Sequence, residues 1–183
     1  MDYQWQKPPV WSVAAGALLL ALGATAGGSL VFQDRFYAVA RPIVLARPAV
    51  HELTGIPAID EAKITETVEQ SNRSFRMLHV HGLGVGMLIL VASTAVAQLP
   101  PARWLQRSLT ILVTLGALYP PGWLLFGLLI PFYGFDALRA PIEYGLFLPF
   151  GGSAIVGLWG TGLWYLLRCG QRWAREGPVA HEV

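Results

Sequence analysis

Hydrophobic residues run along this chain in four long stretches, and all of the charged residues lie outside them, in the connecting segments and at the two ends. The stretches cover about residues 10–32, 77–99, 108–132 and 144–167. A helix needs about 20 apolar residues to cross the roughly 30 Å of hydrocarbon in a bilayer. The pattern therefore predicts an all-α integral membrane protein, with four transmembrane helices in a single membrane domain.

Composition supports this prediction. Of the 183 residues, 54% are hydrophobic and only 13% are charged. Ordinary soluble domains carry about 25% charged residues. We therefore expect the chain to contact the lipid bilayer and either other membrane subunits or a second copy of itself, and we expect no nucleic acid partner.

The distribution of basic residues predicts the orientation. If all four stretches cross the membrane, both chain ends and the 100–107 loop share one side, and the tail at 168–183 is rich in Arg. Residues 33–76 hold equal numbers of basic and acidic residues. The 133–143 loop holds two acidic residues, Asp136 and Glu143, and one basic residue, Arg139. Because cytoplasmic loops carry an excess of Lys and Arg, we expect a bacterial inner membrane protein with both termini in the cytoplasm.

Residues 33–76 are too long for a simple connection, so they are expected to form a structured, partly amphipathic-helical outer loop. The sequence ARPIVLARPAV should be extended or kinked, because proline disrupts a helix interior. After it, Pro57, Asp60 and Glu61 are typical of a helix start. This pattern predicts a short amphipathic helix lying on the membrane surface, separate from the second transmembrane helix.

The second apolar stretch opens with RMLHVHGLGVGM, in which His79 and His81 are two residues apart. At about 100° per residue, the two side chains point about 200° apart, so a regular helix cannot direct both at one ion. We expect one imidazole to face the bundle and the other to face the outer loop or a partner. His81 lies deeper and is the favoured contact for a b-type haem, copper or a quinone.

Gly82 and Gly86 follow at once and form a G-x-x-x-G motif. The commoner role of this motif is close packing against another helix. The same groove could instead accept a flat porphyrin or quinone, with the neighbouring imidazole as ligand or hydrogen-bond partner. The sequence leaves both roles open.

The third stretch contains ALYPPGW at residues 117–123, where two adjacent prolines predict a kink. Tyr119 and Trp123 place polar groups in this apolar surrounding. The bend could form a cavity for a quinone or a lipid tail, since broken helices often accompany membrane binding sites. It could also be a bent helix that only fits its neighbours.

Other candidate ligands are predicted near the outer boundary. His51, Asp136 and Glu143 could join the two histidines of the second stretch in a copper, zinc or iron site. The same residues could simply form a solvated rim.

The apolar stretches contain no charged residue, which argues against a proton pump, an ion channel or a transporter of charged substrates. The chain also lacks P-loop, G-x-S-x-G, H-E-x-x-H and C-x-x-C motifs. Small four-helix subunits of respiratory and other redox complexes share this general architecture. The sequence favours a similar accessory subunit, not catalytic on its own, or alternatively a cofactor-free structural subunit that docks through glycine-rich helix faces.

Overall fold

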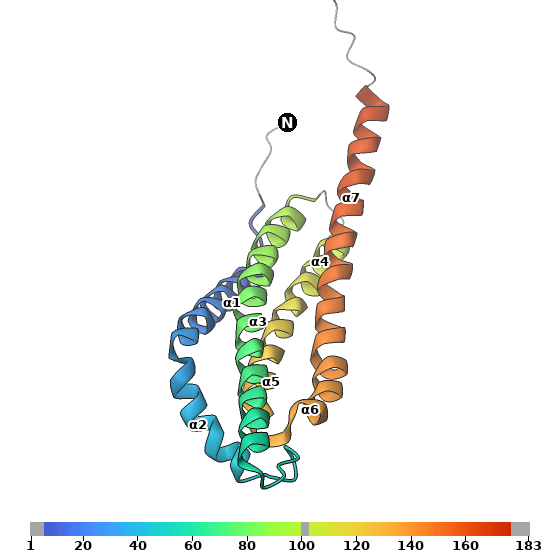
Figure 1. Cartoon of the computed structure of the whole chain (residues 1–183). Coiled ribbons are helices and arrows are strands. Elements are labelled where there is room, and N and C mark those ends of the chain that lie inside the picture. Colours follow the sequence, from blue (N-terminus) through green and yellow to red (C-terminus); the bar gives the residue numbers. More distant parts are fainter. Residues whose placement is uncertain (1–5, 100–102, 177–183) are drawn as a thin grey trace, which may run out of the picture.

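The structure, a computed structural model, describes residues 6–99 and 103–176 and is a bundle of helices (Figure 1). No strand occurs within these residues, so the all-helical prediction is confirmed. In chain order the elements are α1 (Val10–Ser29), the 3₁₀ turn η1 (Leu30–Phe32), α2 (Gln33–Leu45), α3 (Pro57–Ala97), α4 (Arg103–Leu115), the 3₁₀ turn η2 (Gly116–Leu118), α5 (Tyr119–Tyr133), α6 (Phe135–Ile142), the π-helix η3 (Glu143–Gly151) and α7 (Gly152–Glu176).

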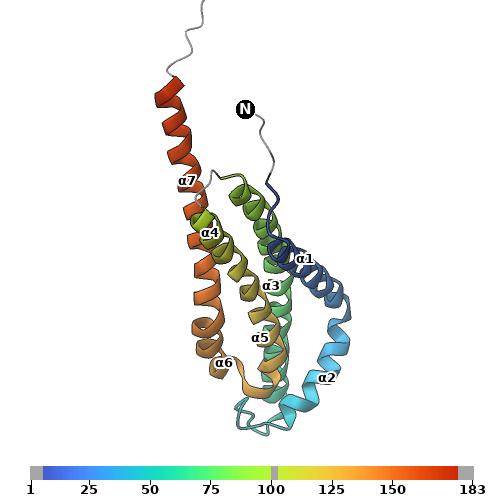
Figure 2. The same cartoon turned by 180° about the vertical axis from the view of Figure 1, so that it is seen from behind.

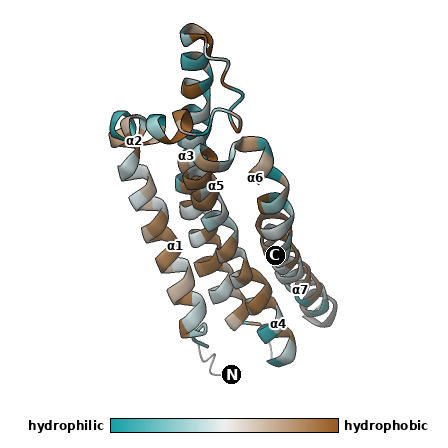
Figure 3. Cartoon of the chain, turned by 90° about the horizontal axis from the view of Figure 1, so that it is seen from below, coloured by the Kyte–Doolittle hydropathy of each residue, from teal (hydrophilic) through white to brown (hydrophobic). Residues whose placement is uncertain are grey.

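Four helical stretches are long and apolar enough to cross a membrane, as predicted: Val10–Leu45, Pro57–Ala97, Arg103–Tyr133 and Phe135–Gln171. Hydrophobic positions run along α1 and α5, whereas hydrophilic positions gather at α2 (Figure 3). The beginning of α1 and the end of α7 lie toward the same end of the bundle, which we call the terminal end (Figures 1 and 2). The opposite end, which holds residues 46–56, is called the loop end.

The predicted surface helix and the second transmembrane helix are one continuous helix. With 41 residues, α3 is about 60 Å long, roughly twice the thickness of the hydrocarbon layer. The predicted start is confirmed, since the helix begins at Pro57 with Asp60 in its first turn. The predicted separation was wrong because neither Pro nor Gly occurs between Pro57 and Gly82, so nothing ends the helix.

Of the segment ARPIVLARPAV, predicted to be extended or kinked, residues 40–45 are helical and end α2, whereas residues 46–50 are not. Pro42 lies inside α2 and leaves one backbone carbonyl without its usual partner. This loss is offset by packing against α3 and α5, because Ala40 and Val44 are only 1% and 0% exposed. Phe36 also packs edge-on against Phe75 of α3, with ring centroids 5.2 Å apart.

The third apolar stretch is interrupted where the sequence predicts. The helix changes to a 3₁₀ turn at Gly116 and resumes as α5 at Tyr119, so Pro120 and Pro121 fall in the first turn of α5. The first backbone N–H groups of a helix have no intrahelical partner, so proline costs least there.

The central helix of the bundle is α3, which packs against α1 and α5, while α4 lies against α7. A buried hydroxyl cluster joins three of these helices. The hydroxyl of Ser12 in α1 is hydrogen-bonded to Ser93 in α3 and to Thr114 in α4, the latter at 2.9 Å. Both serines are 0% exposed. Hydrogen bonds between apolar helices contribute about 0.6 to 2 kcal/mol each, so this cluster helps to fix α1 in the bundle.

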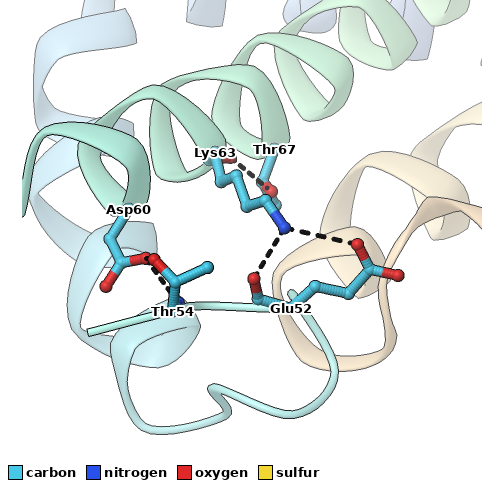
Figure 4. Close-up of polar contacts among 5 residues, drawn as sticks. All are labelled: Glu52, Thr54, Asp60, Lys63 and Thr67. Atoms are coloured by element: carbon cyan, nitrogen blue, oxygen red, sulfur yellow. Dashed lines mark hydrogen bonds and ion pairs between the residues drawn. The ribbon is translucent and has the colours of Figure 1, made fainter. Parts of the chain in front are cut away.

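Polar contacts hold the 46–56 segment against the beginning of α3 (Figure 4). The carboxylate of Asp60 accepts hydrogen bonds from the backbone N–H groups of Thr54 at 2.6 Å and Gly55 at 2.9 Å. Lys63 donates to the backbone carbonyl of Glu52 at 2.6 Å and to its carboxylate at 3.3 Å. The hydrogen bonds, with that from the Thr54 backbone contributing most, lower the pKa of Asp60 below its usual value.

Candidate functional site

His79 and His81 contact different neighbours of α3. Nδ1 of His79 donates a hydrogen bond to the carbonyl oxygen of Gly23 in α1, at 2.9 Å. Nε2 of His81 lies 3.4 Å from the hydroxyl oxygen of Tyr119. The prediction that the two imidazoles point to different sides is confirmed. However, both pack against helices of the bundle, and the expectation that one faces the loop or a partner was wrong.

The face of α3 formed by Gly82 and Gly86 is covered by α1. A Cβ atom at Gly82 would lie 2.8 Å from Cα of Gly23, and one at Gly86 would lie 2.9 Å from the carbonyl oxygen of Gly16. Contacts this short with a neighbouring backbone leave no room for a side chain. Helix packing therefore occupies the groove that a porphyrin or quinone would have needed.

On the other side of α3, four aromatic rings form what we call the His81 cluster: His81, Tyr119, Trp123 and Phe147. The His81 and Trp123 rings are parallel within 6°, with centroids 6.0 Å apart, and the Tyr119 ring meets His81 edge-on at 5.1 Å. Phe147 packs against Tyr119 and Trp123 at centroid distances of 5.2 and 4.4 Å. The structure thus brings three predicted cofactor contacts together.

The local backbone explains how this cluster forms. Because α5 begins at Tyr119, its residues Tyr119 and Trp123 are four apart and share one helix face. Between them, Gly122 allows η3 to approach, since a Cβ atom there would lie 2.6 Å from the Phe147 ring. Sequence reasoning missed Phe147. Phe147 lies in the π-helix η3, and π-helical segments are frequent at functional sites. The local sequence does not predict this π-helix.

The indole N–H of Trp123 is buried and has no hydrogen-bond partner among the described residues. Leaving such a group unpaired costs about 1 to 3 kcal/mol, and a hydrogen bond to a ligand oxygen would offset this cost. Together with the imidazole of His81 and the hydroxyl of Tyr119, the indole N–H provides a set of hydrogen-bonding groups without a carboxylate or a basic side chain of fixed charge. This set is suited to a neutral, flat ligand with oxygen acceptors.

His51 lies apart from the two histidines of α3. It is 8% exposed, and its Nε2 donates a hydrogen bond to the carbonyl oxygen of Pro131 at 3.0 Å. The last carbonyls of a helix have no intrahelical partner, so His51 caps the end of α5. Since Pro131 is 12 residues beyond Tyr119, this contact is about 18 Å along the helix from the His81 cluster.

The remaining predicted metal ligands are also separate. Asp136 lies in the first turn of α6, and Glu143 forms an ion pair with Arg139 at 3.7 Å. Within residues 6–99 and 103–176, no group of three or more His, Cys, Asp or Glu side chains is arranged to hold a metal ion. The five predicted metal ligands are therefore not assembled into one site.

A cavity of about 470 Å³ lies between α1, α2, α3 and α5. The sequence suggested a cavity at the proline bend, but Tyr119 and Trp123 are not among the residues that line this one. Most lining residues are apolar, but Arg35 and Asn72 are among them. Neither residue was singled out from the sequence. The spacing of Asn72, Phe75 and Leu78 could have indicated this site, because residues three apart lie on one face of a helix and all three line the cavity.

Comparison with known proteins assigns the chain to no family. No protein-family model matches it, and no curated protein or solved structure is significantly similar. Its function is therefore inferred from its own residues and their geometry.

Proposed function

We propose that this protein is an accessory subunit of a bacterial membrane redox or energy-converting complex, and that the His81 cluster contacts the head group of a quinone or quinol. The observation that carries the proposal is the buried, unpartnered indole N–H of Trp123 beside the imidazole of His81 and the hydroxyl of Tyr119. A bound quinone would supply two-electron redox chemistry. Tyr119 and Trp123 would donate hydrogen bonds to its oxygen atoms, and the imidazole of His81 would accept the proton that a quinol hydroxyl releases on oxidation.

The depth of the cluster supports this proposal. His81 lies four residues beyond Met77, where the second apolar stretch begins, so it is about 6 Å along the helix from that boundary. A quinone ring at this depth would leave its apolar tail in the hydrocarbon. The site would also lie close enough to the surface for protons to reach it.

The distribution of charge supports an inner-membrane location with the terminal end in the cytoplasm. That end carries Lys7, the basic residues Arg103 and Arg107 at the beginning of α4, and the basic residues near the end of α7. At the loop end, Arg41 and Lys63 are paired with acidic side chains at 3.0 and 3.3 Å. An excess of Lys and Arg in short loops and near helix ends marks the cytoplasmic side of membrane proteins.

A haem or a copper ion fits these residues less well than a quinone. Either would need further ligands beside His81. His79 is directed at Gly23 of α1, and His51 caps α5. Within the part of the chain that the structure describes, no group of three or more His, Cys, Asp or Glu side chains arranged to hold a metal ion includes His81.

The cofactor-free structural subunit remains the second candidate because of α7. Only 11% of the apolar window of the fourth stretch is buried, compared with 22% to 33% in the other three. Large side chains on its open surface include Ile155, Trp159 and Leu166, which are 58% to 69% exposed. Since α1 already covers Gly82 and Gly86, docking to a larger complex would use this surface of α7.

Isolation of the tagged full-length chain from native membranes in mild detergent tests the proposal. We expect redox or energy-converting subunits to co-purify in fixed ratio, with quinone recovered by solvent extraction. Replacing Trp123 by Phe keeps a ring but removes the N–H, and should lower the quinone content. Trp164→Phe is the matched control, because the indole N–H of Trp164 is also buried and unpartnered but lies outside the His81 cluster.

The outcomes separate the two candidates. A complex that contains redox subunits but no quinone would support the structural role. Recovery of the chain alone, without quinone, would overturn the proposal of an accessory redox subunit.

A further inference from the structure

The cavity between α1, α2, α3 and α5 is distinct from the His81 cluster. It has a volume of about 470 Å³, within the usual range for ligand sites. The chain changes direction where η1 joins α1 to α2, so these two helices bow away from α3 (Figures 1 and 2). The cavity lies on the inner side of this bow, where Leu22 of α1, Leu78 of α3 and Leu124 of α5 form part of its wall.

Asn72 precedes Phe75 and Leu78 along α3, so among these three lining residues it lies nearest the loop end. Asn72 lines the cavity and is only 6% exposed, yet its side-chain amide has no hydrogen-bond partner among the described residues. Its amide atoms are not among the fully buried polar atoms, so they are open to the cavity and can bond a polar ligand that enters it. Asn72 belongs to the polar part of α3, before the apolar stretch that begins at about residue 77.

A positively charged residue of α2 also lines the cavity. Arg35 lines the cavity, and its guanidinium lies 5.4 Å from the centre of the Phe32 ring. The ion pairs formed within residues 6–99 and 103–176 do not include Arg35. A guanidinium without an ion pair and an amide without a partner, both lining one cavity, favour an anionic group rich in oxygen, such as a phosphate.

We propose that this cavity binds one anionic phospholipid, with an acyl chain along the leucine wall and its phosphate at Arg35 and Asn72. The occupant must be apolar over most of its length and negatively charged at the loop end, which a phospholipid satisfies. A quinone lacks the charge that Arg35 would recognise. This inference rests on the membrane insertion proposed above, but not on the His81 cluster or on a redox role.

The test is lipid retention by the full-length protein, extracted in mild detergent and measured by native mass spectrometry. The protein is exchanged into micelles that contain phosphatidylglycerol or phosphatidylcholine. Wild type should retain phosphatidylglycerol about fivefold better, which corresponds to one basic residue acting on an anionic lipid. Arg35→Gln should remove this preference. Arg73→Gln, the same charge change outside the cavity, should leave it unchanged.

A second variant tests the apolar part of the cavity. Thr25 lines it, and its hydroxyl is bonded only to Ala21 of its own helix. Thr25→Phe should fill the cavity and reduce retention of both lipids, while the unfolding temperature shows that the bundle is intact. Equal retention of the two lipids by wild type, or equal effects of Arg35→Gln and Arg73→Gln, would overturn the inference. If the protein purified in solution without detergent, that result would contradict the membrane insertion on which both proposals depend.

Discussion

His79 of α3 donates a hydrogen bond from Nδ1 to the carbonyl oxygen of Gly23 in α1, over 2.9 Å. Two residues further on, His81 contacts Tyr119 and Trp123 of α5 instead. The first imidazole thus takes part in the packing of α1 on α3. The second remains next to a buried donor without a partner. Single substitutions can therefore separate a packing role from a binding role.

The close contact of α1 and α3 gives the first prediction. In Gly82→Ala, the new Cβ atom would lie 2.8 Å from Cα of Gly23, and a backbone cannot move away cheaply. Overpacking of this kind costs about 1 to 3 kcal/mol, so the free energy of unfolding in mixed micelles should fall by that amount.

Gly84→Ala is the control for this substitution. It lies two residues along the same helix, and a Cβ atom there meets nothing within 4 Å. Its free energy of unfolding should stay within about 0.5 kcal/mol of the wild-type value. Equal losses for the two variants would mean that α1 does not pack on Gly82.

The buried hydroxyl cluster gives a second prediction. Ser93→Ala removes a bond between α3 and Ser12 of α1, and should lower the free energy of unfolding by about 0.6 to 2 kcal/mol. Thr94→Ala also removes a hydroxyl, but that group is bonded to Leu90 of its own helix. A loss for Thr94→Ala as large as that for Ser93→Ala would show that the hydroxyl cluster does not join the helices.

The four apolar stretches could be predicted from the sequence because a charge-free run of about 20 residues has few stable alternatives to a spanning helix. The interruption at Pro120 was equally predictable, since proline alters the backbone wherever the helix packs. The position of Pro42 inside a helix could not be predicted. Whether a helix tolerates proline depends on the tertiary packing of its neighbours, here Ala40 and Val44.

The candidate site was only partly predictable for the same reason. Helical geometry alone separates His79 from His81, and the spacing of Tyr119 and Trp123 places these on one face. A G-x-x-x-G motif, in contrast, indicates that another group can approach the helix backbone closely, but it does not show whether that group is a helix or a ligand. That α1 fills this groove, and that Phe147 completes the cluster, depends on contacts between distant parts of the chain.

The stability of the loop end should fall in acid when the carboxylate of Asp60 is protonated. Hydrogen bonds from Thr54 and Gly55 lower the pKa of this carboxyl group in the folded state. Its contribution to stability is therefore complete above the usual pKa of 3.8 and is lost as the pH falls through the lower folded value. Hydrogen exchange of the Thr54 and Gly55 amides, corrected for intrinsic rates, should stay slow above about pH 4 and accelerate below it.

Asp60→Asn should abolish this pH dependence and accelerate exchange throughout. Asp34→Asn, which changes an acidic residue of α2 that has no contact with this loop, should behave as wild type. If acid accelerates exchange in Asp60→Asn as much as in wild type, another group controls the loop end.

The charge distribution predicts the topology. A reporter fused after Val183 should be active only in a cytoplasmic format, and one inserted at Gly55 only in a periplasmic format. The reverse pattern would place the His81 cluster near the cytoplasmic face. Activity of both reporters on one side would contradict four membrane crossings.

Binding of a short-chain benzoquinone to the purified protein, followed by isothermal titration, tests the functional proposal most directly. Wild type should bind, and His81→Ala should weaken binding roughly tenfold through the loss of a hydrogen bond. His79→Ala should lower stability through the lost contact with Gly23, yet leave quinone affinity close to wild type. Absence of binding by wild type, or equal affinity of wild type and His81→Ala, would contradict a quinone site at the His81 cluster.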